Sequence, residues 1–294
     1  MATIHATLQG ILPGYGHRKQ SPMDPVRRQP LPKQCDGKYC AYRLRYEDES
    51  YTYGILAKET FFLSTDTRNT RNAELVENIV FGCGMNNSMD SGDEKKNKIA
   101  GIMGLGWGPL SFVTQIDSRS NGKFSYCLPV INLFTPPRPG SHLRFGADIP
   151  ERENSSNTTL QRIKDQKPYY VKLQGISLNG LRLDIPPSVF GLKENGSRIR
   201  EGCIIDSGTA YSRIIRPAYD IFQGELQKYF SNFKNMNRCS GGLGLDLCYE
   251  REKAEGFNNL PTITFHFQGK NSDLVLMPEG SFEVVDRRQF SYQS

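Results

Sequence analysis

The sequence predicts an all-β protein of the sandwich or barrel kind, and three observations support this class. Short runs of β-branched and aromatic residues, many with alternating polar residues, recur along most of the chain. Gly, Pro, Asn and Asp cluster between these runs, as expected for turns. A single segment has the apolar spacing of an amphipathic helix. Many short strands with almost no helix are typical of two packed β-sheets or a closed barrel.

The first predicted strands form a hairpin with an acidic tip. Residues 1–34 have no clear period and are predicted to be irregular. From Cys40, apolar and polar residues alternate up to Tyr46, and an acidic turn at 47–50 leads to a strand at 51–57. Further strands are predicted at 60–63, 75–83, 124–128, 143–145, 169–173, 176–178, 262–267 and 274–277.

The predicted helix begins at Pro217, a residue suited to a first helical turn. Its apolar residues recur at intervals of three and four, which places them on one face. They are Tyr219, Phe222, Leu226 and Phe230.

A polar stretch at 151–159 predicts the boundary between two parts of the chain. We therefore expect a first domain at 35–150 and a second domain at 151–294. They are preceded by an irregular N-terminal segment at 1–34, whose relation to the two domains is left open.

Composition excludes several classes of function. The chain has 37 Lys and Arg against 31 Asp and Glu, and no basic stripe with interleaved aromatic residues, so nucleic-acid binding is not expected. No apolar run is long enough to span a membrane. The seven cysteines form no C-x-x-C pair, and the four histidines do not lie beside cysteines. We expect no metal site and no cofactor.

Four N-x-S/T sequons favour a secreted glycoprotein with disulfide bonds. They begin at Asn86, Asn154, Asn157 and Asn195, all in stretches predicted to be polar and loop-like. The first 20 residues lack the apolar core of a signal peptide. We therefore expect an N-terminal end that is missing or misread, and a protein of the secretory pathway, in the extracellular space or the vacuole.

An aspartate directly after an apolar strand is the strongest candidate for a catalytic residue. Ile204 and Ile205 precede Asp206, and Ser207-Gly208-Thr209 follows it. In such a loop, the glycine allows a sharp turn, and hydroxyl and N–H groups can bond to the carboxylate. Two such loops facing each other would hold one water between two carboxylates, one ionised and one protonated.

A second D-S-G triplet serves as an internal comparison. Asp90-Ser91-Gly92 lies in a highly charged stretch with no apolar strand before it, and is predicted to be a solvated turn. The flanks of Asp206 predict instead the end of a buried strand. From the residues alone, a purely structural turn at Asp206 remains as plausible as a catalytic loop.

Several segments resemble, in the same order, the pepsin-like aspartic peptidases in the form found in plant nepenthesin-type enzymes. The resemblance extends over about 35–286. The matching segments are YEDESYTYGILAKETF (46–61), FGCG (81–84), AGIMGLGWGPLSF (100–112), FSYCL (124–128), YYVKLQGISLNG (169–180), the loop at 204–209, DLCYE (246–250) and LPTITFHF (260–267).

The resemblance implies a bilobal pepsin-like fold and an aspartic endopeptidase that hydrolyses polypeptides at acidic pH through an aspartate-activated water. It implies that Asp206 is the second catalytic aspartate, supported by its loop, and that Tyr46 lies on a flap over the substrate. Ile102, Met103 and Gly104 match the segment that supports the first catalytic loop. The parts at 35–150 and 151–294 would be the two lobes, in a protein expected to be monomeric.

The chain departs from the family in three places. No aspartate in residues 1–45 matches the first catalytic loop, D-T-G-S, and the second hydrophobic-hydrophobic-glycine segment does not appear before Ser294. Both lobes are therefore expected to be incomplete, and the chain by itself inactive. At the flap tip, Glu47 and Glu49 replace two glycines of the family. The alternative is a non-catalytic relative that inhibits a glycoside hydrolase such as a xylanase, although the intact loop at Asp206 argues against it.

The resemblance also bears on the cysteines. It implies that Cys35, Cys40 and Cys83 pair with partners further upstream, and Cys127 and Cys248 with partners further downstream, none of which occurs in this chain. A local loop between Cys239 and Cys248 is a further hypothesis.

One competing catalytic arrangement is also predicted to be absent. His266 lies between Phe265 and Phe267, so it is expected on the wetter face of its strand, and a Ser–His–Asp triad is not supported.

Overall fold

The structure is a computed structural model that divides into two compact units between Gly122 and Lys123, here called the N-unit and the C-unit. The predicted domain boundary at 150 stays a prediction. The structure describes residues 34–35, 39–46, 49–64, 73–88, 100–127, 142–151, 155–163, 166–195, 198–199, 202–209, 212–239, 247–251, 255–286 and 289–292.

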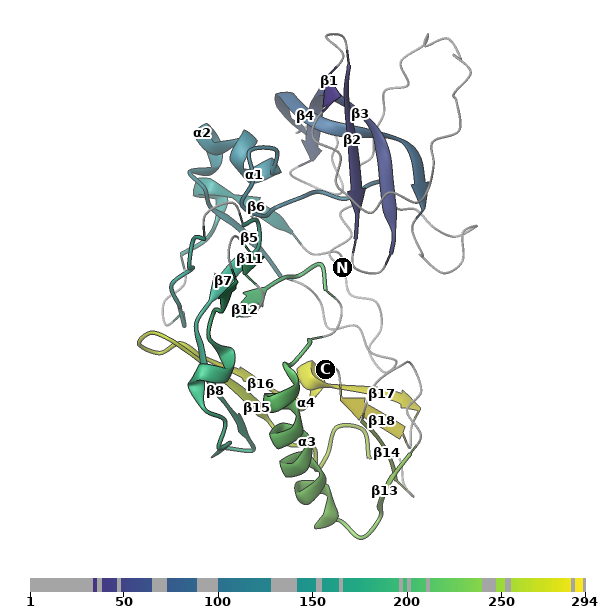
Figure 1. Ribbon diagram of the computed structural model, residues 1–294, viewed down its shortest axis with the longest axis vertical. Coiled ribbons are helices and arrows are strands. Elements are labelled where there is room, and N and C mark those ends of the chain that lie inside the picture. The colour runs from purple at the N-terminus through teal and green to yellow at the C-terminus, as the bar shows by residue number, and fades with distance from the viewer. Residues whose placement is uncertain are drawn as a thin grey trace. The chain divides into compact units, whose positions relative to one another are not determined.

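The N-unit contains one antiparallel sheet in which each strand pairs with the next along the chain (Figure 1). Its strands are β1 (Gln34–Cys35), β2 (Cys40–Arg45), β3 (Tyr51–Ser64) and β4 (Ala73–Ser88). The strands predicted at 51–57 and 60–63 are one strand, because a register shift between Glu59 and Phe61 keeps β3 paired with β4 across the predicted break.

Two short helices, α1 (Phe112–Gln115) and α2 (Asp117–Ser120), pack beside β4, and neither was predicted. The side-chain amide of Gln115 holds them in place. Its Oε1 accepts a hydrogen bond from Val80 N at 2.8 Å, and its Nε2 donates one to Val80 O at 2.9 Å. Buried Val76, Ile79 and Phe112 contribute to the hydrophobic core of this unit.

The C-unit consists mainly of small antiparallel sheets. One has the order β16-β15-β8-β9 and another the order β13-β14-β18-β17, while β12 pairs with β7, β10 with β11 and β5 with β6. The bounds are β5 (Phe124–Tyr126), β6 (Leu143–Phe145), β7 (Tyr169–Val171), β8 (Leu173–Leu178), β9 (Leu181–Arg182), β10 (Glu194–Asn195), β11 (Arg198–Ile199), β12 (Cys203–Ile205), β13 (Met236–Arg238), β14 (Cys248–Arg251), β15 (Ile263–Phe267), β16 (Asp273–Leu276), β17 (Phe282–Asp286) and β18 (Gln289–Tyr292). Short helices lie at η2 (Gly146–Asp148), η3 (Pro187–Phe190) and α4 (Pro278–Ser281).

The predicted helix is confirmed as α3 (Arg216–Ser231), with proline in its first turn. It lies beside β8 (Figure 1), and the four apolar residues predicted for its inner face are all buried. Phe222 and Leu226 are fully buried in a core that also contains Ile176 and Ile263. The mostly β class predicted from the sequence is therefore confirmed.

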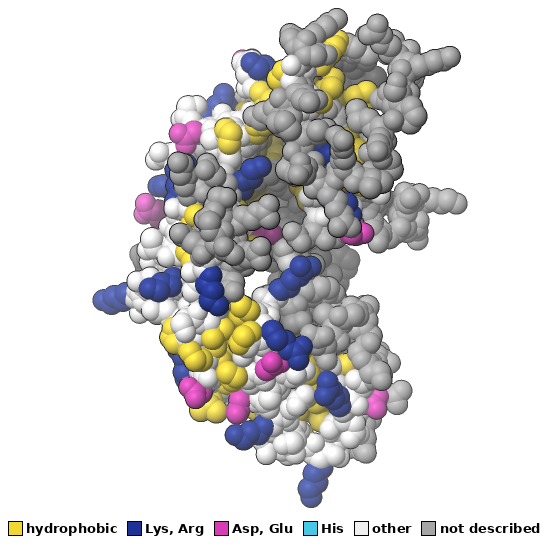
Figure 2. Space-filling view, viewed as in Figure 1, with side chains coloured by type: hydrophobic (Ala, Val, Ile, Leu, Met, Phe, Trp, Pro, Cys, Tyr) yellow, Lys and Arg dark blue, Asp and Glu magenta, His cyan; other side chains and the backbone are white. Residues whose placement is uncertain are grey.

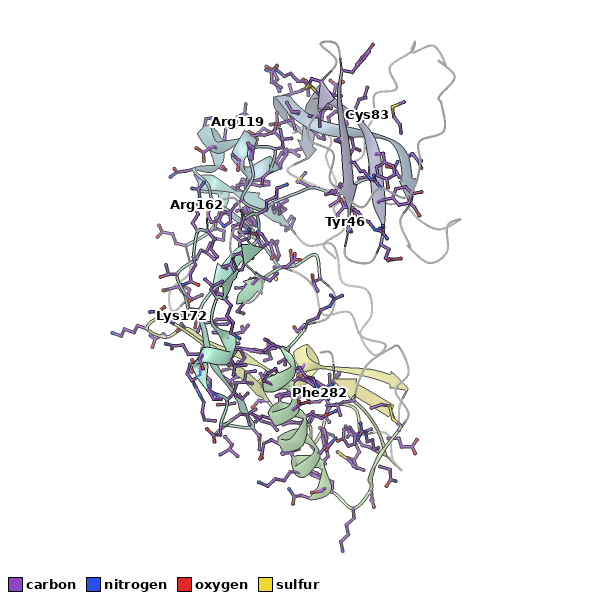
Figure 3. All side chains as sticks on the ribbon, viewed as in Figure 1. Tyr46, Cys83, Arg119, Arg162, Lys172 and Phe282 are labelled. Atoms are coloured by element: carbon purple, nitrogen blue, oxygen red, sulfur yellow. A yellow bond between two sulfur atoms is a disulfide. The ribbon has the colours of Figure 1, made fainter. Side chains whose placement is uncertain are left out.

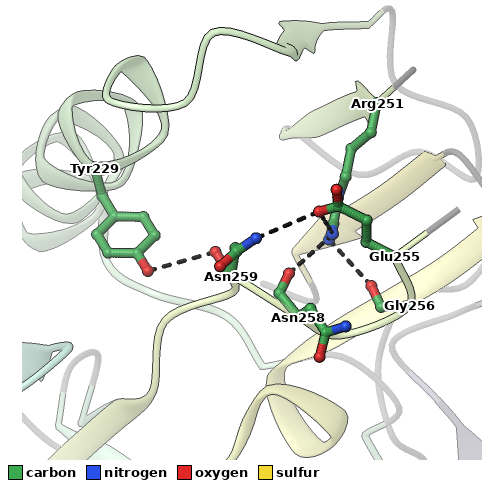
Figure 4. A network of polar contacts seen from close by, with 6 residues as sticks. All are labelled: Tyr229, Arg251, Glu255, Gly256, Asn258 and Asn259. Carbon is green, nitrogen blue, oxygen red and sulfur yellow. Dashed lines mark hydrogen bonds and ion pairs between the residues drawn. The ribbon is translucent and has the colours of Figure 1, made fainter. Parts of the chain in front are cut away.

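A buried arginine organises the loop between β14 and β15 (Figure 4). The side chain of Arg251 is only 4% exposed, and its Nη1 lies 3.3 Å from Oε2 of Glu255. It also donates hydrogen bonds to the carbonyl oxygens of Asn258, at 2.9 Å, and Gly256, at 3.0 Å. Burial lowers the pKa of Arg251, and the neighbouring carboxylate of Glu255 opposes that shift.

The disulfide bonds differ in part from those that the resemblance implies. Cys35 pairs with Cys40, because β1 folds back on β2 and brings the two residues into register. Cys239 pairs with Cys248, as the local hypothesis predicted. The expectation that Cys35, Cys40 and Cys248 depend on distant partners is therefore wrong for this structure.

Candidate functional site

The loop after β12 holds the carboxylate of Asp206 through its own residues. Gly208 N donates a hydrogen bond to Oδ1 at 2.8 Å, and the hydroxyl of Thr209 donates one to Oδ2 at 2.8 Å. Each carboxylate oxygen therefore has one donor from the loop, which suits a group that only accepts hydrogen bonds. The carboxylate is oriented by residues two and three positions further along the chain.

The glycine of this loop has a geometric role. A Cβ built on Gly208 would lie 3.1 Å from Asp206 Oδ1, which is tighter than an ordinary contact. The missing side chain therefore lets the backbone N–H approach the carboxylate. Ser207, the other residue of the predicted loop, is half-buried.

The prediction that Asp206 follows a buried strand is wrong. Ile204 is 45% exposed and Ile205 46% exposed, and Asp206 itself is exposed. The physical reason lies in the pairing. Among the described residues, β12 pairs only with β7, and no described strand pairs with its other edge. The carboxylate in this structure is therefore solvated and does not bear the desolvation expected of a buried charge.

Cys203, at the start of β12, is less exposed than the two isoleucines. It is half-buried, and burial raises the pKa of its thiol to about 11. The Cys203 thiol, three residues before Asp206, is therefore protonated at neutral pH and is a weak nucleophile.

Tyr46 lies where β2 ends, in the turn of the predicted hairpin (Figure 3). Its backbone N–H donates to Ser50 O at 2.8 Å, and its carbonyl accepts from Glu49 N at 3.1 Å. The hairpin between β2 and β3 is confirmed. The role of Tyr46 over a substrate stays a prediction. Glu47, at the tip, lies outside the described residues.

Glu49 has a backbone conformation that favours glycine. Its φ is 68°, in the left-handed region. The resemblance places one of the two replaced glycines of the flap at this turn, and the backbone keeps the conformation that such a glycine would adopt. The side chain of Glu49 forms an exposed ion pair with Arg45 at 3.1 Å.

The segment at Ile102, Met103 and Gly104 supports the start of α1. The carbonyl oxygen of Gly104 accepts hydrogen bonds from Phe112 N at 2.9 Å and from the Ser111 hydroxyl at 3.2 Å. Ile102 is 46% exposed, and Met103 is half-buried. Support of a first catalytic loop by this segment stays a prediction. It belongs to the N-unit with Tyr46, whereas Asp206 belongs to the C-unit.

The prediction that all four sequons lie in loop-like stretches is wrong for two of them. Asn86 lies in β4, and the backbone of Asn195 forms part of β10. Asn157 lies outside helices and strands and is exposed, while Asn154 falls outside the described residues. Alternation of polar and apolar residues did not reveal the end of β4, because that end is polar on both faces.

Sequence reasoning also missed a hydrogen-bonded chain of Ser177, His266 and Asp273. Ser177 Oγ lies 2.7 Å from His266 Nε2, and His266 Nδ1 lies 2.9 Å from Asp273 Oδ1. The prediction that no Ser–His–Asp arrangement is present is therefore wrong, because the three side chains do lie in a hydrogen-bonded row. His266 is also less exposed to solvent than predicted, since only 18% of its side chain is accessible.

This chain nevertheless lacks, among its described residues, the exposed nucleophile that a serine hydrolase would place in such a cluster. Ser177 is only 3% exposed, and it does not line the neighbouring cavity of about 420 Å³. Residues that do line this cavity include Gln174, Arg182, His266 and Asp273. No signal in the sequence indicated the cluster, because it depends on the pairing of β8, β15 and β16.

Two further findings concern metal ligands and membrane-spanning helices. Within the part of the chain that the structure describes, no three or more His, Cys, Asp or Glu residues are placed to hold a metal ion. None of the described helices is both long and apolar enough to cross a membrane.

Comparison with known proteins gives the family. Residues 19–147 match the family model described as Xylanase inhibitor N-terminal, and residues 168–290 match Xylanase inhibitor C-terminal. The chain is 36% identical to aspartic proteinase nepenthesin-1 of Nepenthes gracilis over 84% of this chain and 51% of that protein. It is 34% identical to aspartyl protease AED1 of Arabidopsis thaliana over 81% of this chain and 45% of that protein.

Two solved structures share the fold. The first is edgp, with a TM-score of 0.63 and 14% sequence identity, and the match covers 88% of this chain and 66% of edgp. The second is conglutin gamma from lupine seeds, with a TM-score of 0.58 and 18% sequence identity, and the match covers 86% of this chain and 63% of conglutin gamma. The fold and the D-S-G-T motif at Asp206 are those of an acid-protease-like protein. The chain belongs to the plant pepsin-like aspartic peptidase family. It spans about half the length of the curated relatives it matches.

Proposed function

We propose that this chain contributes Asp206 as a catalytic aspartate to an aspartic-type endopeptidase, which hydrolyses polypeptides at acidic pH. One observation carries the proposal. Both oxygens of the Asp206 carboxylate are held by donors of its own loop, Gly208 N and the Thr209 hydroxyl. An exposed carboxylate that is oriented in this way is ready to hold a water molecule, whereas an ordinary surface aspartate is free to rotate.

The chemistry requires a second carboxylate beside Asp206. The ionised carboxylate takes a proton from water as the water oxygen attacks the peptide carbonyl carbon, and the protonated one donates a proton to the carbonyl oxygen. On collapse of the tetrahedral intermediate, the carboxyl group that took the water proton gives it to the amine nitrogen as the C–N bond breaks, and the other carboxylate takes a proton back from a hydroxyl group of the intermediate. Because the chain has one such loop, we propose that it does not cleave peptides by itself.

A first experiment tests this inactivity. The purified chain is incubated with denatured haemoglobin at about pH 3, with and without pepstatin, and released peptides are measured. We expect no pepstatin-sensitive cleavage. Cleavage that pepstatin blocks would show that the chain already has a complete catalytic pair.

A second experiment tests Asp206 itself. A first catalytic loop is restored by fusing the corresponding N-terminal segment of nepenthesin-1 ahead of residue 35, and the fusion is assayed in the same way. Asp206→Asn is expected to lower kcat at least about a hundredfold, the contribution of one acid–base group. Asp90→Asn, in the other D-S-G triplet, is the matched control and should leave kcat unchanged. An active fusion that keeps its kcat after Asp206→Asn would exclude the proposed role.

The second candidate function is inhibition of a xylanase without catalysis. The observation that favours it is the description of the two matching family models, which names xylanase inhibitors. The test is the release of reducing sugar from xylan by a microbial xylanase at increasing concentrations of this chain. Saturable inhibition that survives Asp206→Asn would support this function over the peptidase.

The proposal extends to the substrates, the oligomeric state and the compartment of the protein. The substrates are polypeptides, the chain is a monomer, and the protein travels the secretory pathway to the extracellular space or the vacuole. The two disulfide bonds support an oxidising compartment.

A further inference from the structure

The sequon at Asn86, Asn87 and Ser88 occupies the end of β4, where it is part of a paired strand. All three residues are exposed. Their partners on β3 are Tyr53 opposite Asn86 and Tyr51 opposite Ser88. Residues directly opposite each other in an antiparallel pair have side chains on the same face, with their Cβ atoms about 5 Å apart.

The two tyrosines form a continuous aromatic surface beside this sequon. Their rings are stacked, with centroids 4.7 Å apart and planes 19° apart. The guanidinium of Arg43, on β2, lies 4.9 Å from the centre of the Tyr53 ring. The rings are therefore fixed from the β2 side, while the acceptor Asn86 lies on the β4 side of the same face.

The middle residue of the sequon belongs to the opposite face. Asn87 Oδ1 accepts a hydrogen bond from the Thr52 hydroxyl at 2.6 Å, and the Thr52 hydroxyl lies 2.8 Å from Tyr42 Oη. This network fixes the register of β3 and β4 at the sequon. It therefore holds Asn86 and the two stacked rings on one side of the sheet.

We propose that Asn86 carries an N-linked oligosaccharide whose first sugars pack against Tyr51 and Tyr53. The C–H face of a pyranose ring is apolar and packs well on an aromatic ring, while its hydroxyl groups stay in water. This inference is independent of the proposed peptidase activity. It rests on passage of the chain through the secretory pathway, where the sugar donor is found.

The attachment is a simple group transfer. Asn86 Nδ2 attacks the anomeric carbon of an oligosaccharide linked to a lipid pyrophosphate. The N–C bond forms and Nδ2 loses a proton, while the bond from the anomeric carbon to the pyrophosphate oxygen breaks and the lipid pyrophosphate leaves with the electron pair. No oxidant or reductant takes part.

The sequon at Asn157 offers a matched comparison in the same chain. Asn157 and Thr159 are exposed and lie outside strands, and Thr158 between them is half-buried. The Thr158 hydroxyl donates to Gln268 O at 2.7 Å. Among the described ring contacts, none places an aromatic pair at this sequon. A glycan at Asn157 would therefore extend into solvent.

The test uses the full chain secreted from cultured mammalian cells behind a cleavable leader. Mass spectrometry of glycopeptides measures occupancy at Asn86 and Asn157, and native and denatured protein are then treated with peptide-N-glycosidase F. We expect the Asn86 glycan to leave the native protein about tenfold more slowly than the denatured protein, a ratio that matches one good aromatic contact. The Asn157 glycan should leave both at similar rates.

Variants separate packing from general folding. The double variant Tyr51→Ala, Tyr53→Ala should remove most of the tenfold difference, while Tyr53→Phe should retain it. Leu44→Ala is the control and should change nothing, because Leu44 is an exposed residue of β2 that lies opposite Thr52, on the other face of the sheet from Tyr51 and Tyr53. The proposal is overturned if Asn86 is unmodified in secreted protein. It is also overturned if the native protein releases the Asn86 glycan as fast as the denatured protein does, or if the double variant retains the protection.

Discussion

At the scale of single residues, the loop at Asp206 shows how much local geometry a short stretch of sequence can specify. The two donors to Asp206 come from Gly208 and Thr209, so the hydrogen bonds form within one turn of the chain. For this reason the orientation of the carboxylate could be predicted from the sequence. Its exposure could not, since exposure depends on which segments cover β12.

The burial of Cys203 leads to a prediction about thiol reactivity. With a pKa of about 11, only about one thiol in a thousand is ionised at pH 8, and the thiolate is the reactive form. Iodoacetamide should therefore modify Cys203 far more slowly than the exposed Cys83 and Cys127. The measurement is the rate of alkylation at each cysteine by peptide mass spectrometry.

The alkylation rate of Cys203 should also depend on pH. Because burial raises the pKa, the alkylation rate of Cys203 should rise about tenfold per pH unit from pH 8 towards 11. Denatured protein is the control, and in it all three thiols should react alike. Equal rates in native protein at pH 8 would contradict the burial of Cys203.

At the scale of elements, the turn between β2 and β3 contains a strained residue. Glu49 has a φ of 68°, a conformation that costs a side-chain-bearing residue about 1 kcal/mol and glycine almost nothing. Glu49→Gly should therefore stabilise the N-unit slightly, by about 0.5 kcal/mol after loss of the exposed ion pair with Arg45. Thermal unfolding followed by circular dichroism would measure the change.

The matched control for this turn is Glu49→Gln. It removes the charge and keeps the strained backbone, so it should not stabilise the protein. If both variants have the same effect, the cause is the charge of Glu49 and not its conformation.

Two glycines of the C-unit form a second test at this scale. A Cβ added to Gly224, inside α3, or to Gly180, in the turn between β8 and β9, would meet no atom within 4 Å. The two glycines differ in conformation, since Gly180 has a φ of 81°. Gly224→Ala should stabilise the protein by about 0.5–1 kcal/mol, because alanine is the better helix former.

Gly180→Ala should destabilise by about 1 kcal/mol, because the left-handed conformation is unfavourable for alanine. Urea unfolding of both variants would measure the free energies. The same sign for both substitutions would show that backbone conformation does not decide the outcome.

The lengths of strands were predicted less well than their existence. Strand β4 runs to Ser88, past the end predicted at Cys83. Its last residues, 86–88, are polar on both faces but are held in the sheet by pairing with residues 51–53 of β3. The helix α3 was predicted well, since its apolar face repeats over several turns and its start carries a proline. The short helices α1 and α2 were missed, because four residues are too few to show a helical period.

At the scale of the whole molecule, stability of the C-unit depends on the core around α3. Phe222 is fully buried there among residues from several strands. Phe222→Ala should lower the free energy of unfolding by about 3–5 kcal/mol, through lost burial and the cavity that remains. Met277→Ala, at a side chain that is 58% exposed, is the control and should change it by less than about 0.5 kcal/mol. Urea unfolding followed by circular dichroism measures both, and equal effects would contradict the core that the structure shows.

Surface features of the C-unit were not visible in the sequence. Large apolar side chains such as Leu181, 61% exposed, remain on the surface, and Figure 2 shows apolar side chains gathered near β8. A strand with alternating residues has one inward face, but which face meets a core depends on the partner strands.

The sequence by itself determined the features that depend on neighbours a few positions away. These include the mostly β class, the hairpin at Tyr46, the helix α3 and the hydrogen-bonded loop at Asp206, while the local disulfide of Cys239 was one hypothesis that the structure confirms. The tertiary structure alone decided which groups from distant segments meet. Ser177 and His266 are 89 positions apart, and Tyr51 and Tyr53 meet the sequon of Asn86 only because β3 and β4 pair in one register. Short-range hydrogen bonds need only residues that are close in the sequence, whereas contacts across strands exist only once the sheets have assembled.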